Sequence, residues 1–173
     1  MLAYVLIQHN AHRLLLISQH GFDWSLFIEF VDGQRMLATK RWTAQNMANI
    51  LILIIDDEIE TIDLVGMGLT RCGYEVIGAT SGLEGLDLIR TRKPALLLLD
   101  LMMPQLSGYD VCRQLRADSE TTHLPIIILS ASSTVHAANE ALAAGANRFA
   151  SKPVGIKQLA GLIESTLSGA EKQ

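Results

Sequence analysis

Apolar and polar positions follow a regular order over residues 49–170. Five short apolar runs are each followed by a longer segment in which apolar residues recur at helical spacing. The predicted strands are residues 50–55, 74–79, 95–99, 124–129 and 147–151. The predicted helices are residues 59–72, 81–92, 108–117, 134–144 and 155–167. This order predicts one domain in which parallel strands are covered by helices on both faces.

Local signals mark where several of these elements begin and end. Ser81 and Ser107 stand where a side-chain hydroxyl can cap the amino terminus of a helix, and Gly73 stands where a helix can end in the left-handed conformation. The expected fold is α/β, a flavodoxin-like (βα)5 doubly wound parallel sheet with strand order 2-1-3-4-5. In that order the first and third strands are neighbours, and ligands bind outside the carboxyl ends of the strands.

The first 48 residues differ in composition from the remainder. Both tryptophans and three of the four phenylalanines lie there. This segment has four basic and three acidic residues, a net charge of +1, whereas the remainder carries 10 minus 15, or −5. Its apolar runs at residues 4–7, 14–17 and 26–31, the last followed by the turn dipeptide Asp32-Gly33, favour a small antiparallel meander. An upstream segment without a function of its own is an equally good interpretation.

Composition narrows the class of protein. The net charge of −4 argues against binding to a phosphate backbone, so no direct contact with nucleic acid is expected. Cys72 and Cys112 show no CxxC motif and no paired spacing. Such isolated cysteines are typical of a protein in a reducing compartment. The amino terminus lacks the features of a secretory leader, and no apolar run reaches the roughly 18 residues of a membrane span. We therefore expect a cytoplasmic protein with no membrane contact.

Polar side chains follow four of the predicted strands. Asp56 and Asp57 follow the first strand, Asp100 the third, Ser130 the fourth and Lys152 the fifth. Because the carboxyl ends of parallel strands lie at one edge of a sheet, these side chains are expected to converge. A single aspartate after a strand is easily explained as a cap of the next turn. The ordered set of residues is what indicates a site.

The residue types at these positions suit phosphoryl transfer. Neighbouring carboxylates repel each other, which raises the pKa of at least one of them unless a cation lies among them. Mg²⁺ prefers such hard oxygen ligands and keeps water molecules that a phosphoryl donor can replace. With Mg²⁺ and the Lys152 ammonium neutralising the phosphoryl oxygens, Asp100 can act as a nucleophile and form an aspartyl phosphate. Ser130 can donate a hydrogen bond to a phosphoryl oxygen.

Four segments resemble the receiver domain of two-component response regulators. They are IIDDE at 54–58, LLLDLMMPQLSGYDVCRQLR at 97–116, LPIIILSAS at 124–132 and ALAAGANRFASKP at 141–153. The resemblance covers about residues 49–168 and implies that Asp100 is the phosphoacceptor and Lys152 the phosphate-binding lysine. It also implies that Asp57 binds Mg²⁺ directly and that Asp56 assists. Asp100 and the backbone carbonyl of Met102 complete the implied ligands.

The same resemblance implies a switch made of the Ser130 hydroxyl and the Phe149 ring, which report phosphorylation at a protein-binding surface. Two positions depart from the commonest receiver pattern. Arg148 stands where receivers often carry an acid, and Val154 where they often carry an aromatic residue. These departures concern the surface built by the fourth and fifth helices, and leave the chemical positions intact.

The resemblance implies a phosphoacceptor signalling module of a two-component or phosphorelay system. It would catalyse only its own phosphoryl transfer and dephosphorylation, so it is not expected to be an enzyme with an external substrate. The implied phosphodonor is a sensor histidine kinase or a histidine phosphotransfer protein, and the output passes to a downstream protein target. Because the last predicted helix ends near Leu167, we expect a stand-alone receiver.

Two other functions fit parts of the pattern. A receiver fold that acts as a phosphorylation-independent scaffold would carry the same residues. A haloacid-dehalogenase-like phosphatase also forms an aspartyl phosphate with Mg²⁺ and a lysine. Its nucleophile, however, opens a DxD motif after the first strand, where this chain has Asp56-Asp57-Glu58. A nucleotide-binding module would need a glycine-rich loop at that place, where this chain has three acidic residues instead.

Overall fold

The computed structural model of the 173-residue chain describes residues 13–16, 26–31, 34–35, 39–40 and 50–170. The chain divides into two compact units, Met1–Met47 and Ala48–Gln173. In the first unit, β1 (Arg13–Leu16), β3 (Gln34–Arg35) and β4 (Thr39–Lys40) each pair antiparallel with β2 (Leu26–Val31). The predicted run at residues 4–7 and the Asp32-Gly33 turn lie outside the described residues.

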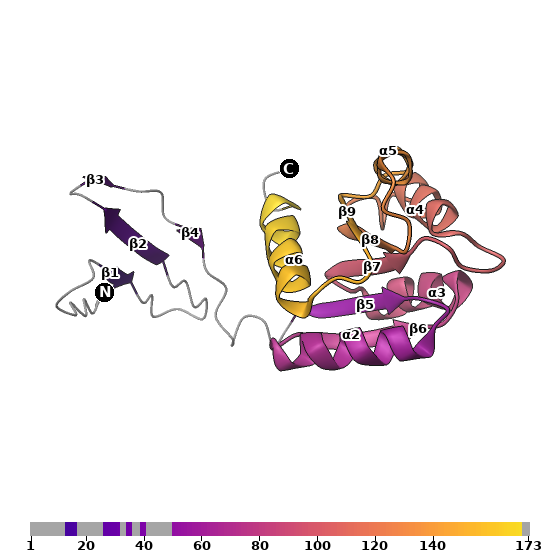
Figure 1. Ribbon diagram of the computed structural model, residues 1–173, viewed down its shortest axis with the longest axis horizontal. Coiled ribbons are helices and arrows are strands. Elements are labelled where there is room, and N and C mark those ends of the chain that lie inside the picture. The colour runs from indigo at the N-terminus through magenta and orange to yellow at the C-terminus, as the bar shows by residue number, and fades with distance from the viewer. Residues whose placement is uncertain (1–12, 17–25, 32–33, 36–38, 41–49, 171–173) are drawn as a thin grey trace. The chain divides into compact units, whose positions relative to one another are not determined.

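The second unit contains a parallel sheet of five strands (Figure 1). The strands are β5 (Leu51–Ile55), β6 (Glu75–Ala79), β7 (Leu96–Asp100), β8 (Ile126–Ser130) and β9 (Arg148–Ser151). Their order in the sheet is β6-β5-β7-β8-β9. This is the order 2-1-3-4-5, so the predicted flavodoxin-like fold is confirmed.

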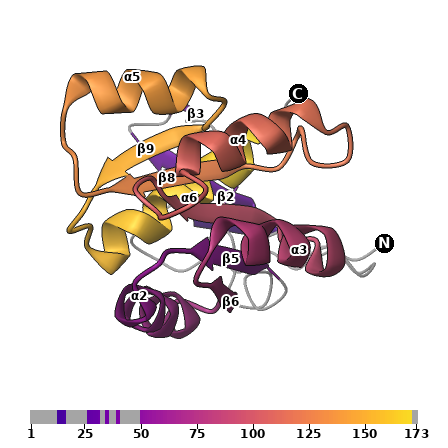
Figure 2. The same ribbon diagram turned by 90° about the vertical axis from the view of Figure 1, so that its right-hand side faces the viewer.

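Five helices cover the two faces of this sheet (Figures 1 and 2). They are α2 (Ile59–Arg71), α3 (Gly82–Arg92), α4 (Gly108–Ala117), α5 (Val135–Ala143) and α6 (Ile156–Ala170). Helices α2 and α6 pack together on one face. Buried side chains of α3, α4 and α5 share the core on the other face with β5, β7 and β8. Within the described residues, no helix combines the length and apolar character needed to cross a membrane.

The central strands form where the chain is continuously aliphatic. Every residue of β7 and β8 is buried, as is all of β5 after its first residue. Strands covered on both faces need apolar side chains at successive positions, which explains why these runs do not alternate with polar residues. Strand β6 lies at the edge of the sheet and is mostly exposed or half-buried. Among the inner strands, polar residues therefore stand at the carboxyl ends, as Asp100 in β7 and Ser130 in β8.

The predicted helix ends are largely confirmed. The Ser81 hydroxyl accepts a hydrogen bond from Glu84 N, and the Ser107 hydroxyl accepts one from Asp110 N. Gly73 follows α2 with a φ of 97°, a conformation that L-residues with side chains rarely adopt. Helix α6 extends to Ala170, beyond the predicted end near residue 167. Helical spacing of apolar residues does not fix the last exposed turn of a helix.

The guanidinium of Arg116 joins the carboxyl end of α4 to the loop between α5 and β9. Its Nε donates to the Gly145 carbonyl at 2.8 Å, and its Nη2 donates to Asn147 Oδ1 at 3.0 Å. The same Asn147 oxygen accepts from Ile126 N at 2.9 Å, which ties the loop to the start of β8. We call these three residues, Arg116, Gly145 and Asn147, the Arg116 tie. It lies at the opposite ends of the strands from the predicted site.

Candidate functional site

The carboxyl ends of β5, β7, β8 and β9 supply the residues that the sequence singled out. Asp56 directly follows β5, Asp100 ends β7, Ser130 ends β8, and Lys152 directly follows β9. The parallel register pairs Asp100 with Leu129 and Ser130 with Ser151. Lys152 N donates to the Ser130 carbonyl at 2.7 Å, so β8 fixes the backbone that carries the lysine.

The lysine side chain crosses the sheet edge to two carboxylates. Lys152 Nζ lies 2.6 Å from Asp56 Oδ2 and 2.5 Å from Asp100 Oδ1. The side chains of Asp56 and Asp100 are 3% and 8% exposed, and that of Lys152 is 22% exposed. Such short contacts between charged groups are strong because little water screens them. Residues 44 to 96 positions apart in the chain thus form one cluster, as predicted.

The electrostatics of this cluster follow from burial and from its one cation. Burial raises the pKa of Asp56, and the hydrogen bonds from Lys152 and from Glu58 N offset only part of this effect. Burial alone would lower the pKa of Lys152, but its hydrogen bonds to Asp100 and Asp56 outweigh burial and raise it. Two ionised carboxylates and one ammonium leave the cluster with a formal charge of −1.

Backbone donors complete the surroundings of the two carboxylates. Met102 N donates to Asp100 Oδ2 at 2.6 Å, and Glu58 N donates to Asp56 Oδ1 at 3.0 Å. The loop after β7 is held in turn by Gly108 N, which donates to the Leu101 carbonyl at 3.0 Å. Each carboxylate therefore has a fixed orientation. The sequence alone did not reveal these backbone donors, because any residue type can supply an N–H group.

Asp57 and the Met102 side chain are exposed at the rim of this cluster. No hydrogen bond or ion pair of Asp57 is found within the part of the chain that the structure describes, and no three acidic, histidine or cysteine side chains there converge as a metal site. The oxygen donors nevertheless fit Mg²⁺ in kind. Asp56, Asp57, Asp100 and the Met102 carbonyl are all hard oxygen groups, and the cluster has excess negative charge.

Ser130 and Phe149 occupy neighbouring strands next to this cluster. Ser130 is fully buried, and its Oγ accepts a hydrogen bond from Ser132 N at 3.1 Å. The hydroxyl proton is therefore free to be donated elsewhere. Phe149 is half-buried and packs against the core on the α3, α4 and α5 face. The ring thus lies partly in the core and partly at the surface.

Comparison with known proteins places these features in a family. The model for the response regulator receiver domain matches residues 52–164. "Probable transcriptional regulator ycf27" of Porphyra purpurea is 41% identical over 121 residues, which are 70% of this chain and 49% of that protein. A response regulator receiver domain protein of Clostridium thermocellum has a solved structure that is 30% identical in sequence. It covers 70% of this chain and 97% of that chain, with a TM-score of 0.65.

A third relative has DNA binding in its name. The "DNA-binding dual master transcriptional regulator RpaA" of Synechocystis sp. is 32% identical over 121 residues, which are 70% of this chain and 50% of that protein. The chain thus spans about half the length of the curated relatives it matches. The expectation that this chain makes no direct contact with nucleic acid stays a prediction, and so does the expectation of a stand-alone receiver.

Proposed function

The chain belongs to the response regulator receiver domain family of two-component systems, and on this premise we propose that Asp100 is its phosphoacceptor. The observation that carries the proposal is the cluster of Lys152 with Asp56 and Asp100. A buried carboxylate with a fixed orientation and a neighbouring ammonium is the arrangement that an aspartyl phosphate requires. The phosphodonor is a histidine kinase or a histidine phosphotransfer protein, and the recipient of the signal is a downstream protein.

In the proposed reaction, a carboxylate oxygen of Asp100 attacks the phosphorus atom of the donor. The new oxygen–phosphorus bond forms as the bond to the donor breaks, and the donor group leaves with the electron pair. Lys152 remains protonated and neutralises a phosphoryl oxygen, since negative charge on these oxygens opposes attack by an anion. The chain turns over no external substrate, so this step serves signalling.

Mg²⁺ is part of this proposal, because one ammonium cannot neutralise the aspartates and an incoming phosphoryl group. Asp56, Asp57, Asp100 and the Met102 carbonyl would hold the ion, which supplies positive charge to the phosphoryl oxygens. Asp56 is already oriented by Glu58 N, and Asp100 by Met102 N. Asp57 directly follows Asp56 in the chain and forms no hydrogen bond or ion pair among the described residues.

We expect acetyl phosphate with Mg²⁺ to add one phosphoryl group to the chain, measured by intact mass spectrometry. Asp100→Asn and removal of divalent cations with EDTA should each abolish the added mass. Asp87→Asn, which changes an exposed aspartate on α3, is the matched control and should be phosphorylated normally.

An adduct that persists in Asp100→Asn would contradict the assignment. Absence of any adduct on the native chain would favour a phosphorylation-independent scaffold. Sustained release of phosphate from many molecules of a phosphate ester per chain would favour a phosphatase.

The output switch is the second part of the proposal. A phosphoryl group at Asp100 brings about −1.5 to −2 charge and three acceptor oxygens. Ser130 would turn its hydroxyl proton toward one of these oxygens, and Phe149 would move inward into the space that this turn vacates. Phosphorylation thereby favours one of two existing states of the surface formed by α5, β9 and α6.

We expect beryllofluoride with Mg²⁺, which mimics the phosphoryl group, to produce the largest remote NMR shift changes in residues 134–144 and 147–149. Ser130→Ala should reduce these remote changes while the changes around Asp100 remain. If the native chain showed changes only around Asp56, Asp57 and the Met102 loop, the site would not be coupled to this surface.

A further inference from the structure

The outward face of α2 carries a stripe of four exposed residues. Glu60, Leu64, Met67 and Arg71 follow one another at intervals of four, three and four residues, so they lie along one line of the helix. Leu64 is 67% exposed and Met67 is 56% exposed. We call these four residues the α2 stripe. Its centre is apolar, its amino end is acidic and its carboxyl end is basic.

The α2 stripe is complementary to itself when one copy is reversed. Reversal about the point midway between Val65 and Gly66 exchanges positions whose numbers add up to 131. Glu60 then lies opposite Arg71 of a second copy, because 60 and 71 make 131. Leu64 likewise lies opposite Met67, because 64 and 67 make 131. Glu60 and Arg71 are both exposed, and neither forms an ion pair within the described part of the chain.

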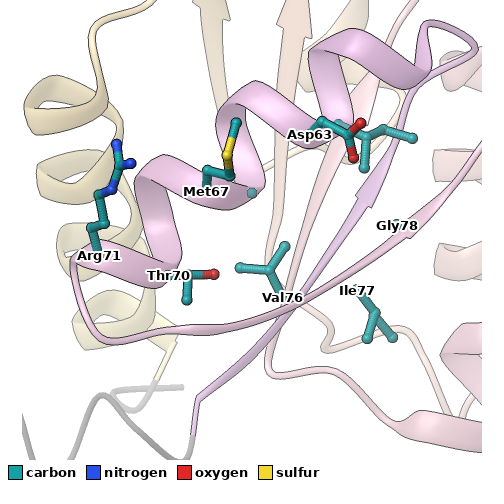
Figure 3. Close-up of a pocket in the computed structure, with 9 residues that line it drawn as sticks. Asp63, Met67, Thr70, Arg71, Val76, Ile77 and Gly78 are labelled. Atoms are coloured by element: carbon teal, nitrogen blue, oxygen red, sulfur yellow. The ribbon is translucent and has the colours of Figure 1, made fainter.

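A groove runs beside the α2 stripe on the side of the edge strand β6 (Figure 3). Its volume is about 450 Å³. It is bordered on α2 by Asp63, Met67, Thr70 and Arg71, and on β6 by Val76, Ile77 and Gly78. Two members of the α2 stripe, Met67 and Arg71, thus also border the groove. A helix that lies along the stripe would shield the apolar groove from water as well as Leu64 and Met67.

We propose that a second copy of this chain docks on α2, with the two α2 helices antiparallel and related by a two-fold axis. Each Glu60 pairs with Arg71 of the other copy, and Leu64 and Met67 form the apolar centre. The four-three-four spacing is that of a seam between two helices packed at a shallow angle. A two-fold axis requires one surface to match itself, which the reversed stripe does. The proposal does not rest on phosphorylation of Asp100.

The size of the seam limits the strength of this dimer. A helix of 13 residues is about 20 Å long, so the contact is smaller than those of stable complexes, which bury about 1,200–2,000 Å². We therefore expect reversible association with a dissociation constant between about 10 µM and about 1 mM.

Sedimentation of the full chain over that concentration range tests the proposal. Glu60→Arg and Arg71→Glu each place like charges at both symmetry-related contacts, so each should weaken the dimer by about tenfold or more. The combined variant Glu60→Arg/Arg71→Glu restores opposite charges and should return to within about threefold of the native dissociation constant. Arg90→Glu makes the same charge change as Arg71→Glu on α3 and should have no effect.

Recovery in the combined variant is specific to a contact between two copies, because a chain that misfolds would not regain association. The proposal is overturned if the native chain stays monomeric to about 1 mM. It is also overturned if the single variants dimerise like the native chain, or if the combined variant fails to recover. In those cases α2 docks another protein or none.

Discussion

At the scale of single residues, Tyr74 illustrates the energetic cost of a buried group without a partner. The residue is 3% exposed, and its hydroxyl has no hydrogen-bond partner among the described residues. Burial raises the pKa of Tyr74 to about 12, and the nearby Glu164 and Cys72 add to the effect. The folded chain therefore holds this proton more tightly than the unfolded chain, for which the ordinary value is 10.0.

We expect Tyr74→Phe to increase the free energy of unfolding at neutral pH by about 1 kcal/mol, because it removes a buried polar group that lacks a partner. In the native chain, stability linked to Tyr74 is present below pH 10 and is lost as the pH rises to about 12, since only the unfolded chain ionises readily in that window. Urea unfolding of both proteins should thus show that the free energy of unfolding of Tyr74→Phe exceeds that of the native chain by an amount that grows as the pH rises above 10.

Tyr109→Phe is the control for this prediction. The Tyr109 hydroxyl donates to Glu140 at 3.3 Å, so its removal should bring no gain at neutral pH. A native chain more stable than Tyr74→Phe at every pH would show that the hydroxyl has an acceptor.

The site shows which single residues a sequence can predict. Asp56, Asp100 and Lys152 were predictable because each stands at the end of an apolar run, and parallel strands bring such ends together. Arg116 and Asn147 were not predictable as partners. They are 31 positions apart in the chain, and each is an ordinary polar residue until the fold places them at 3.0 Å.

At the scale of elements, the first residue of α4 packs directly against the end of β7 that carries Asp100. A Cβ atom added at Gly108, the first residue of α4, would lie 2.3 Å from the Asp100 carbonyl oxygen. Backbone cannot move aside as a flexible side chain can. The glycine therefore lets α4 begin directly against the strand end that carries Asp100.

We expect Gly108→Ala to lower the free energy of unfolding by about 3 kcal/mol, because the methyl group must displace the end of β7. The same displacement should slow phosphorylation of Asp100 by acetyl phosphate by at least about tenfold. Urea unfolding and intact mass spectrometry measure the two effects.

Gly161→Ala is the matched control. A Cβ at Gly161, within α6, meets no atom within 4 Å, so the change should stabilise the helix by about 1 kcal/mol. Equal effects of the two substitutions would show that β7 and α4 are not closely packed.

The elements themselves were largely predictable from the apolar runs. The predicted strand at 95–99 and the observed β7, Leu96–Asp100, differ by one residue at each end. Such shifts arise because hydrogen bonds to the neighbouring strand, which the sequence does not show, decide where a strand ends. The left-handed Lys93 that caps α3, with a φ of 48°, was not foreseen either, because residues with a side chain rarely adopt that conformation.

At the scale of the whole molecule, the two units can be tested separately. We expect a chain that starts at Met47 to keep its thermal unfolding midpoint within a few degrees and to be phosphorylated like the full chain. The reason is that the complete sheet and the site lie within Ala48–Gln173. Calorimetry and mass spectrometry give the two readouts. A large loss of stability would instead show that the first 46 residues support the receiver domain.

The Arg116 tie should also constrain how α5 moves when the site is phosphorylated. It holds the loop at the carboxyl end of α5, whereas the amino end of α5 follows Ser130 and Ser132, close to the site. A helix that is held at one end and displaced at the other rotates about the held end. Within α5, a small shift at Ser130 should therefore displace the amino end near residue 134 most and the carboxyl end near residue 145 least. Arg116→Met would remove the hydrogen bonds to Gly145 and Asn147, and α5 would then translate as a whole without rotating.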